Sequence, residues 1–179
     1  MYLFLLSSLA IGSAVIVAAS AVWYVLTVIG NWKIFEKAGE APWKSIIPFL
    51  NTYTDYKIPW KGVYGIAFIV VSMISSYYSN AVNTYRIYQT QTIQNGEVVA
   101  EHVVAAPSTA LTIVGLIAGI VVIIFNFLKA KNLAKAFGKS TGFMVGLFLF
   151  EPLFRILLGF GSDEYIGPEG NSNAPKTFM

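Results

Sequence analysis

The stretch "FMVGLFLFEPLFRILLGF", residues 143–160, decides how often this chain is expected to cross a membrane. It is apolar over a length that could span a bilayer, yet it carries Glu151, Pro152 and Arg155. On a helix, Glu151 and Arg155 lie on one face within reach of each other, because they stand at positions i and i+4. A lone charge near the bilayer centre costs about 2.5 to 3.5 kcal/mol on insertion scales, so this intramembrane polar pair should face protein rather than lipid.

Two interpretations of the pair remain open. Either Glu151 and Arg155 neutralise each other in the packed interior, or they belong to a site that contacts a solute, a proton path or a second subunit. Pro152 removes a backbone hydrogen bond in the same turn, which predicts a kink or a break of the helix there.

The composition of the whole chain is also that of a membrane protein. Hydrophobic residues make up 56% of the 179 residues and charged residues only 12%, far from the balance of soluble domains. The net charge of +3 comes with lysines that flank apolar runs, so we expect no nucleic-acid partner. The chain has no cysteine and one histidine, and we expect no metal site, no cofactor and no thiol nucleophile.

Four apolar runs predict an all-α membrane protein with four transmembrane helices. They cover about residues 3–30, 62–81, 107–128 and 143–160. The first run is longer than the ~20 residues that a ~30 Å hydrocarbon core requires, and a cleaved signal peptide is disfavoured because no basic segment precedes it. Residues 1–168 are expected to form a single membrane domain, followed by a flexible tail over residues 169–179.

The lysines orient these spans. They concentrate after the first and third runs, so both segments should be cytoplasmic and both termini should lie outside. We expect a multi-pass protein of the bacterial cytoplasmic membrane. The second lysine group should anchor the inner face and bind anionic lipid headgroups; its members are Lys129, Lys131, Lys135 and Lys139.

The segment between the first two spans is rich in proline. Its prolines at positions 42, 48 and 59 are too many for one helix. We expect an irregular segment on the cytoplasmic side, and whether it lies in the headgroup layer or re-enters the membrane stays open. It either covers the inner end of the bundle as a lid or lines a polar pocket, whose candidate residues are Asn51, Tyr53, Asp55, Tyr56 and Asn126.

Residues 84–104 predict a short extracytoplasmic β-hairpin. β-branched and aromatic residues flank Asn95 and Gly96 on both sides, and an Asn-Gly pair in such a setting is the strongest short-range hairpin signal. An isolated two-stranded ribbon is marginally stable in water. We therefore expect this hairpin to bind a partner: the tail, a neighbouring subunit or another protein.

Three motifs carry a family resemblance: "KAGEAPWKSIIPFLNTY", "AKAFGKSTGFMVGLFLFEPLF" and "LLGFGSDEYIGP". The chain resembles a small uncharacterised bacterial membrane-protein family that occurs alone or as a module attached to signal peptidase I. The resemblance extends over most of the chain outside residues 83–106, and it implies no activity.

Two short segments, "EKAG" and "AKAFGK", each follow a charge-free run and lead into an apolar stretch with proline. This similarity suggests the hypothesis that the chain arose by a parallel duplication of one unit.

These features favour a non-enzymatic accessory or scaffold subunit, in contact with membrane lipids and with another membrane protein or a second copy of itself. The alternative is a small oligomeric transporter or channel for an ion or small solute, whose path would use Glu151, Arg155, Asn126 and Asn51. An enzyme is least favoured. Ser72 and Met73 resemble the nucleophilic serine motif of signal peptidase I, but no lysine in a neighbouring span could act as the base, and we assign no catalytic residue.

Overall fold

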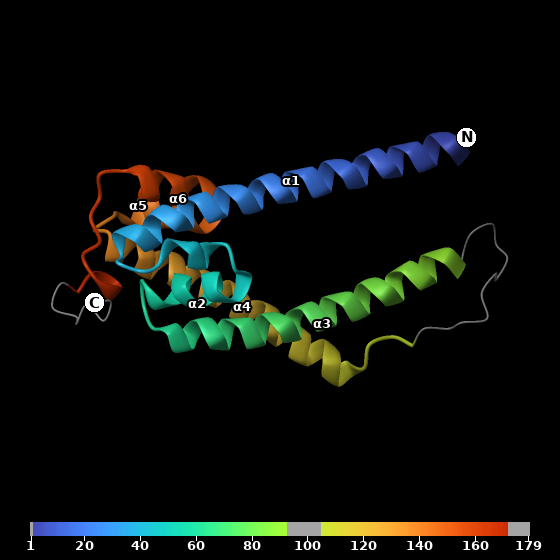
Figure 1. The fold of residues 1–179 in the computed structure, drawn as a ribbon. Coiled ribbons are helices and arrows are strands. Elements are labelled where there is room, and N and C mark those ends of the chain that lie inside the picture. Colours follow the sequence, from blue (N-terminus) through green and yellow to red (C-terminus); the bar gives the residue numbers. More distant parts are fainter. Residues whose placement is uncertain (1, 93–104, 172–179) are drawn as a thin grey trace. The chain divides into compact units, whose positions relative to one another are not determined.

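The computed structural model describes residues 2–92 and 105–171, and every regular element in these ranges is helical (Figure 1). The chain divides into two compact units, the first made of Met1–Gly65 with Lys129–Met179 and the second of Ile66–Leu128. The elements in chain order are α1 (Tyr2–Lys37), η1 (Pro42–Ser45), α2 (Pro48–Lys57), α3 (Gly62–Thr92), α4 (Thr109–Ala136), α5 (Thr141–Leu149), α6 (Glu151–Phe160) and η3 (Pro168–Gly170).

Three helical stretches among the described residues are long and apolar enough to cross a membrane. They are Ala14–Lys37 in α1, Gly62–Arg86 in α3 and Thr109–Ala136 in α4. These stretches support the prediction of a helical membrane protein, and they correspond to the first three predicted spans.

The predicted fourth span over residues 143–160 is wrong. The chain breaks at Phe150, whose backbone angles of φ −129° and ψ 51° are not helical. At 1.5 Å per residue, α5 and α6 are each only about 14 to 15 Å long, roughly half the thickness of the hydrocarbon core. The two helices fold back on each other, since the rings of Phe143 and Phe154 lie with centroids 5.1 Å apart. They form a helical hairpin rather than one crossing helix.

Pro152 and Gly146 account for this reversal. Pro152 stands in the first turn of α6, where its missing N–H costs no hydrogen bond, whereas a continuous helix through it would lose one. Gly146 leaves room for the ring of Phe154, because a Cβ at this glycine would lie 2.1 Å from ring atoms. The break that Pro152 predicted is therefore confirmed, and it comes with a complete turn of the chain.

The predicted β-hairpin over residues 84–104 is wrong in the part that the structure describes. Helix α3 continues to Thr92, so the expected first strand is helical. β-branched and aromatic residues favour a strand only where neighbouring strands pack against them. The turn residues Asn95 and Gly96, and the expected second strand up to residue 104, lie outside the described residues. So do residues 172–179 of the predicted flexible tail.

The loss of the fourth span also removes the basis for placing both termini outside. Three crossings put the two ends of a chain on opposite sides of a membrane, whereas four put them on the same side. The lysine pattern itself is unaffected by this correction.

The proline-rich segment is more regular than predicted. Pro42 opens η1 and Pro48 opens α2, and the first helical turn is the position at which proline is best tolerated. The chain runs back along α1 through η1, reverses at Ile46 and Ile47, and returns through α2. Irregular backbone was expected because three prolines cannot share one helix interior, but Pro42 and Pro48 each begin a short helix.

Helices α1 and α4 end in the same way. Gly39 and Gly138, which follow them, have positive φ angles of 77° and 64°, a conformation that glycine adopts without steric cost. Both ends show the hydrogen bonds of a glycine-terminated helix: Glu40 N donates to Phe35 O and Lys139 N to Ala134 O, each at 2.8 Å. Each end is followed by a short helical hairpin, which favours the duplication hypothesis.

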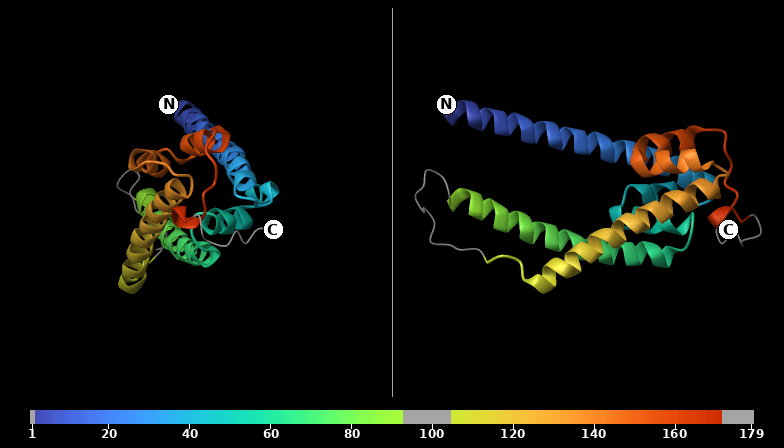
Figure 2. Two further views of the ribbon diagram at one scale, coloured as in Figure 1. Left: turned by 90° about the vertical axis from the view of Figure 1, so that its left-hand side faces the viewer. Right: turned by 180° about the vertical axis from the view of Figure 1, so that it is seen from behind.

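In the first unit, α6 lies against the C-terminal part of α1 (Figures 1 and 2). A Cβ at Gly30 would lie 3.0 Å from the carbonyl carbon of Arg155, and a Cβ at Gly159 would lie 2.9 Å from Cβ of Lys33. The two helices therefore run parallel at close approach, as small residues allow in membrane proteins. The buried core beside this contact includes Ile34, Phe35, Ile58, Leu133 and Leu158.

In the second unit, α3 and α4 pack antiparallel. The ring of Tyr78 covers Gly115, where a Cβ would lie 2.1 Å from it. Further along, the rings of Phe68 and Phe125 lie with centroids 6.3 Å apart.

Candidate functional site: a buried cluster of four charges

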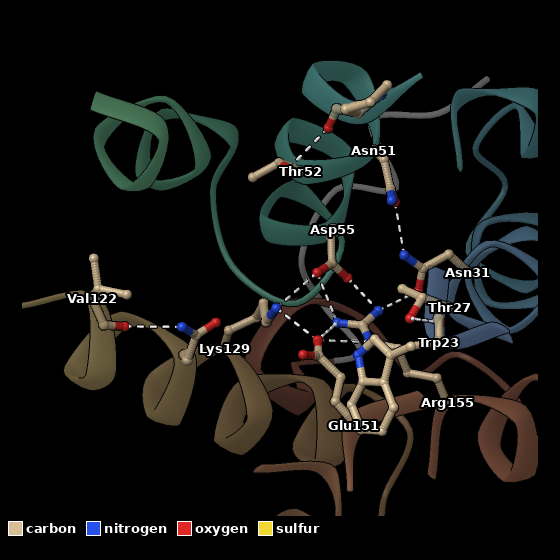
Figure 3. A network of polar contacts seen from close by, with 12 residues as sticks. Trp23, Thr27, Asn31, Asn51, Thr52, Asp55, Val122, Lys129, Glu151 and Arg155 are labelled. Atoms are coloured by element: carbon tan, nitrogen blue, oxygen red, sulfur yellow. Dashed lines mark hydrogen bonds and ion pairs between the residues drawn. The ribbon is translucent and has the colours of Figure 1, made fainter. Parts of the chain in front are cut away.

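Four ionisable side chains from three helices meet inside the first unit (Figure 3). They are Asp55 of α2, Lys129 of α4, and Glu151 and Arg155 of α6. We call these four residues the charge cluster. Residues that are far apart in the sequence are thereby joined at one place.

Arg155 is the centre of the charge cluster, and its side chain is 1% exposed. Its Nη1 donates to Oδ1 of Asp55 at 2.6 Å and its Nη2 donates to Oδ2 at 2.7 Å. Nε donates to Oε1 of Glu151 at 2.9 Å, and Nη1 also donates to Oδ1 of Asn31. Two-pronged contacts between arginine and carboxylate are among the strongest and most directional hydrogen bonds in proteins.

Lys129 completes the charge cluster from α4. Its Nζ lies 2.8 Å from Oε1 of Glu151 and 3.1 Å from Oδ2 of Asp55. The same ammonium group lies 5.5 Å from the centroid of the Tyr56 ring, within the range of a cation–π contact. Each carboxylate is thus shared between the lysine and the arginine.

Two asparagines extend the cluster to α1. Asn31 accepts a hydrogen bond from Arg155, and its Nδ2 donates to Oδ1 of Asn51 at 2.7 Å. Asn31 therefore links α6 to α2 through α1. Because its amide both accepts and donates here, this buried side chain is satisfied on both sides.

The formal charges of the cluster cancel, since two carboxylates face two cations. Removing a charge from water costs several kcal/mol unless opposite charges and hydrogen bonds compensate it. Glu151, with a side chain 35% exposed, is the most accessible member, while Asp55 and Lys129 are 8% and 10% exposed. Together with Asn31, the charge cluster can hold α1, α2, α4 and α6 in a defined register.

Some of the residues predicted for the polar pocket join the charge cluster, and others make different contacts. Asp55 and Asn51 join the cluster, and Tyr56 lies beside Lys129. Tyr53 instead packs its ring against the start of α3, where it would meet a Cβ at Gly62 at 2.5 Å. Asn126, in the second unit, donates to the carbonyl of Val122 in its own helix at 3.1 Å.

The four lysines predicted to anchor the inner face lie in different environments. Lys129 is buried in the charge cluster rather than at a headgroup surface, and Lys139 pairs with Asp163 at 2.7 Å. Lys131 and Lys135 are exposed, as an anchor requires. Asn31 was not predicted at all, although a polar residue at the end of a charge-free run is a usable signal for an intramembrane contact.

A second buried carboxylate, Glu40, joins the two ends of the hairpin formed by η1 and α2. Its Oε2 lies 2.5 Å from Nζ of Lys44 and its Oε1 lies 2.8 Å from Nζ of Lys57. Burial alone would raise the pKa of the Glu40 carboxyl, but the two ammonium groups bind its charged form and hold the pKa below its usual value.

The segment after α6 packs onto the same end of the first unit. The hydroxyl of Tyr165 donates to the carbonyl of Ile58 at 2.7 Å, and the amide of Glu169 donates to the carbonyl of Pro59 at 2.9 Å. Burial raises the pKa of Tyr165 to about 12, so this hydroxyl remains a donor at any physiological pH.

Comparison with known protein families gives a match over part of the chain. Residues 93–168 match a family described as "Family of unknown function (DUF5684)". No curated protein and no solved structure matches. The matched range holds Lys129, Glu151 and Arg155, together with two of the three resemblance motifs, while the motif that begins at Lys37 precedes it. Over residues 93–168, the chain is therefore similar to an uncharacterised protein family.

Proposed function

We propose that this chain is a non-enzymatic scaffold or accessory subunit of a protein complex in the bacterial cytoplasmic membrane. The observation that carries the proposal is the closed character of the charge cluster. Each of its four charges lies within 3.1 Å of an opposite charge, and the formal charges cancel. A cluster of this kind stabilises one arrangement of helices and leaves no uncompensated charge in the cluster for a solute.

The surfaces of the candidate spans support the same proposal. In the most apolar 18-residue segment of each candidate span, in chain order, only 11%, 6% and 11% is buried within the chain. The remaining surface is available to lipid or to the helices of a partner, and membrane helices associate through close packing of such faces. Signal peptidase I is one candidate partner, because the family that the sequence resembles also occurs attached to that enzyme.

Photo-crosslinking in intact cells tests the proposal. A photoreactive amino acid replaces Ile117 or Ile120 in turn, two exposed residues of α4. We expect both positions to give adducts with the same membrane protein. Ser140, exposed but outside the candidate spans, is the matched control and should give no such adduct. Adducts with lipid alone at both positions would overturn the scaffold proposal.

The transporter alternative rests on the partial exposure of Glu151. Purified protein in liposomes, loaded with a pH-sensitive or a cation-sensitive dye, measures whether protons or small cations cross. We expect no flux above that of empty liposomes. Flux from the wild type that Glu151→Gln removes would replace the scaffold proposal by the alternative.

A further inference from the structure

The first unit contains two short helical hairpins with apolar tips. The first hairpin comprises residues 42–57 and the second residues 141–160. At the tip of the first, Ile46 and Phe49 are 53% and 63% exposed; at the tip of the second, Leu149 and Phe150 are 59% and 55% exposed. Large apolar side chains that cluster at a tip mark a surface that binds something apolar.

The two tips lie at similar positions along α1. The hydroxyl of Tyr24 donates to the carbonyl of Ile46 at 2.8 Å, and Tyr24 lies about 20 Å before Lys37 at the helical rise. In the second hairpin, Arg155 packs on Gly30, and Phe150 lies about 8 Å further from the end of α1. Both tips therefore reach the charge-free part of α1.

Several backbone polar groups at both tips have the partners that burial in hydrocarbon requires. Non-helical backbone is tolerated at membrane depth only where its polar groups find partners within the protein. The Ile46 carbonyl has the Tyr24 hydroxyl, and the Ile47 carbonyl accepts from Asn51 N at 2.7 Å. At the second tip, Phe150 N donates to Gly146 O at 2.8 Å and its carbonyl accepts from Phe154 N at 3.2 Å.

The open ends of the two hairpins are charged. Glu40 and Lys57 lie at the open end of the first, where the ammonium group of Lys44 also reaches Glu40. Lys139 with Asp163 lies at the open end of the second. Lysines of this kind mark the cytoplasmic interface. The tips continue the exposed apolar surface of α1, where Val22 and Val25 are 58% and 52% exposed, so the occupant that fits them is hydrocarbon.

We propose that both hairpins are re-entrant: they enter the membrane from the cytoplasmic side, seat their tips among lipid acyl chains of the inner leaflet, and return to the same side. The segment after α6 then stays cytoplasmic, where Tyr165 and Glu169 bind the carbonyls of Ile58 and Pro59. This inference is independent of the scaffold proposal, because it concerns lipid and not a protein partner.

Spin labelling in phospholipid vesicles tests the contact with lipid. The chain has no cysteine, so Phe49→Cys and Phe150→Cys can each carry one nitroxide without background. We expect relaxation by oxygen, which dissolves in hydrocarbon, to exceed relaxation by a water-soluble nickel chelate several-fold at both tips, as at the reference Val22→Cys. Ala41→Cys and Gly142→Cys, at the open ends, are matched controls and should show the opposite ratio.

Thiol labelling then separates a re-entrant hairpin from a crossing helix. With an impermeant thiol reagent, Gly142→Cys and Ser162→Cys flank the second hairpin and should both react only after the cell membrane is opened. Reaction of Ser162→Cys alone on intact spheroplasts would overturn the proposal in favour of a crossing. In the spin-label experiment, access of the nickel chelate to the tips equal to its access to Ala41→Cys would overturn the proposal, because the tips would then lie in water. Low access of both oxygen and the nickel chelate would also overturn it, because a protein partner would then cover the tips.

Discussion

At the scale of single residues, Arg155 is the side chain on which the charge cluster depends most. Its guanidinium contacts both carboxylates and Asn31. Because its side chain is only 1% exposed, water cannot solvate its charge in place of these partners. Arg155→Gln leaves Asp55 and Glu151 with only Lys129. We expect a loss of about 3 to 5 kcal/mol in stability, the usual cost of leaving a buried charge unpaired, seen as a lower melting temperature in detergent.

A double variant separates the cost of an unpaired charge from the cost of losing a pair. Glu151→Leu with Arg155→Met removes one charge of each sign and leaves Asp55 and Lys129, which lie 3.1 Å apart. We expect this variant to recover most of the melting temperature lost in Arg155→Gln. Glu36→Gln breaks the exposed pair with Lys33 and, as control, should change stability by about 0 to 1 kcal/mol. A double variant as unstable as the single one would contradict this account.

Glu40 predicts a pH dependence. Lys44 and Lys57 lower the pKa of the Glu40 carboxyl in the folded state. Its ion pairs therefore contribute fully to the stability of the fold above the unfolded carboxyl's pKa of about 4.3, and this contribution is lost as the pH falls through the lower folded pKa. We expect the melting temperatures of wild type and Glu40→Gln to differ most at neutral pH and to converge below about pH 4. A difference that stays constant between neutral and acid pH would show that the ion pairs contribute nothing.

At the scale of elements, the contact between α1 and α6 depends on glycine. A Cβ at Gly30 would meet the backbone of Arg155 at 3.0 Å, and backbone cannot move aside as a side-chain end can. We expect Gly30→Ala to lower stability by about 1 to 3 kcal/mol through overpacking. Gly142→Ala in the first turn of α5, whose Cβ would lie 3.8 Å from its nearest neighbour, is the control and should change stability by less than about 1 kcal/mol. Thermal unfolding followed by circular dichroism measures both.

At the scale of the whole molecule, the lysines predict which side of the membrane each segment occupies. Ala106→Cys, between α3 and α4, should react with an impermeant thiol reagent on intact spheroplasts. Ala41→Cys, in the lysine-rich segment after α1, should react only after permeabilisation. The reversed pattern would show that the chain has the opposite orientation.

Local patterns in the sequence predicted several features of the fold. The helical membrane class follows from apolar runs whose composition is visible without the fold. The contact between Glu151 and Arg155 was predictable because residues four apart on a helix are neighbours. The break near Pro152 was predictable because proline cannot donate a backbone hydrogen bond.

Only the tertiary structure decided the rest. One long helix and a hairpin of two short helices can have the same apolar composition, so hydropathy could not tell that residues 143–160 reverse at Phe150. The charge cluster joins Asp55 to Arg155 across 100 residues, and a single sequence holds no signal for such a meeting. Lys129 looked like a headgroup anchor because its neighbours in sequence are lysines. Its side chain is buried instead because Lys129 lies about two turns before the end of α4, where it meets the carboxylates of Asp55 and Glu151.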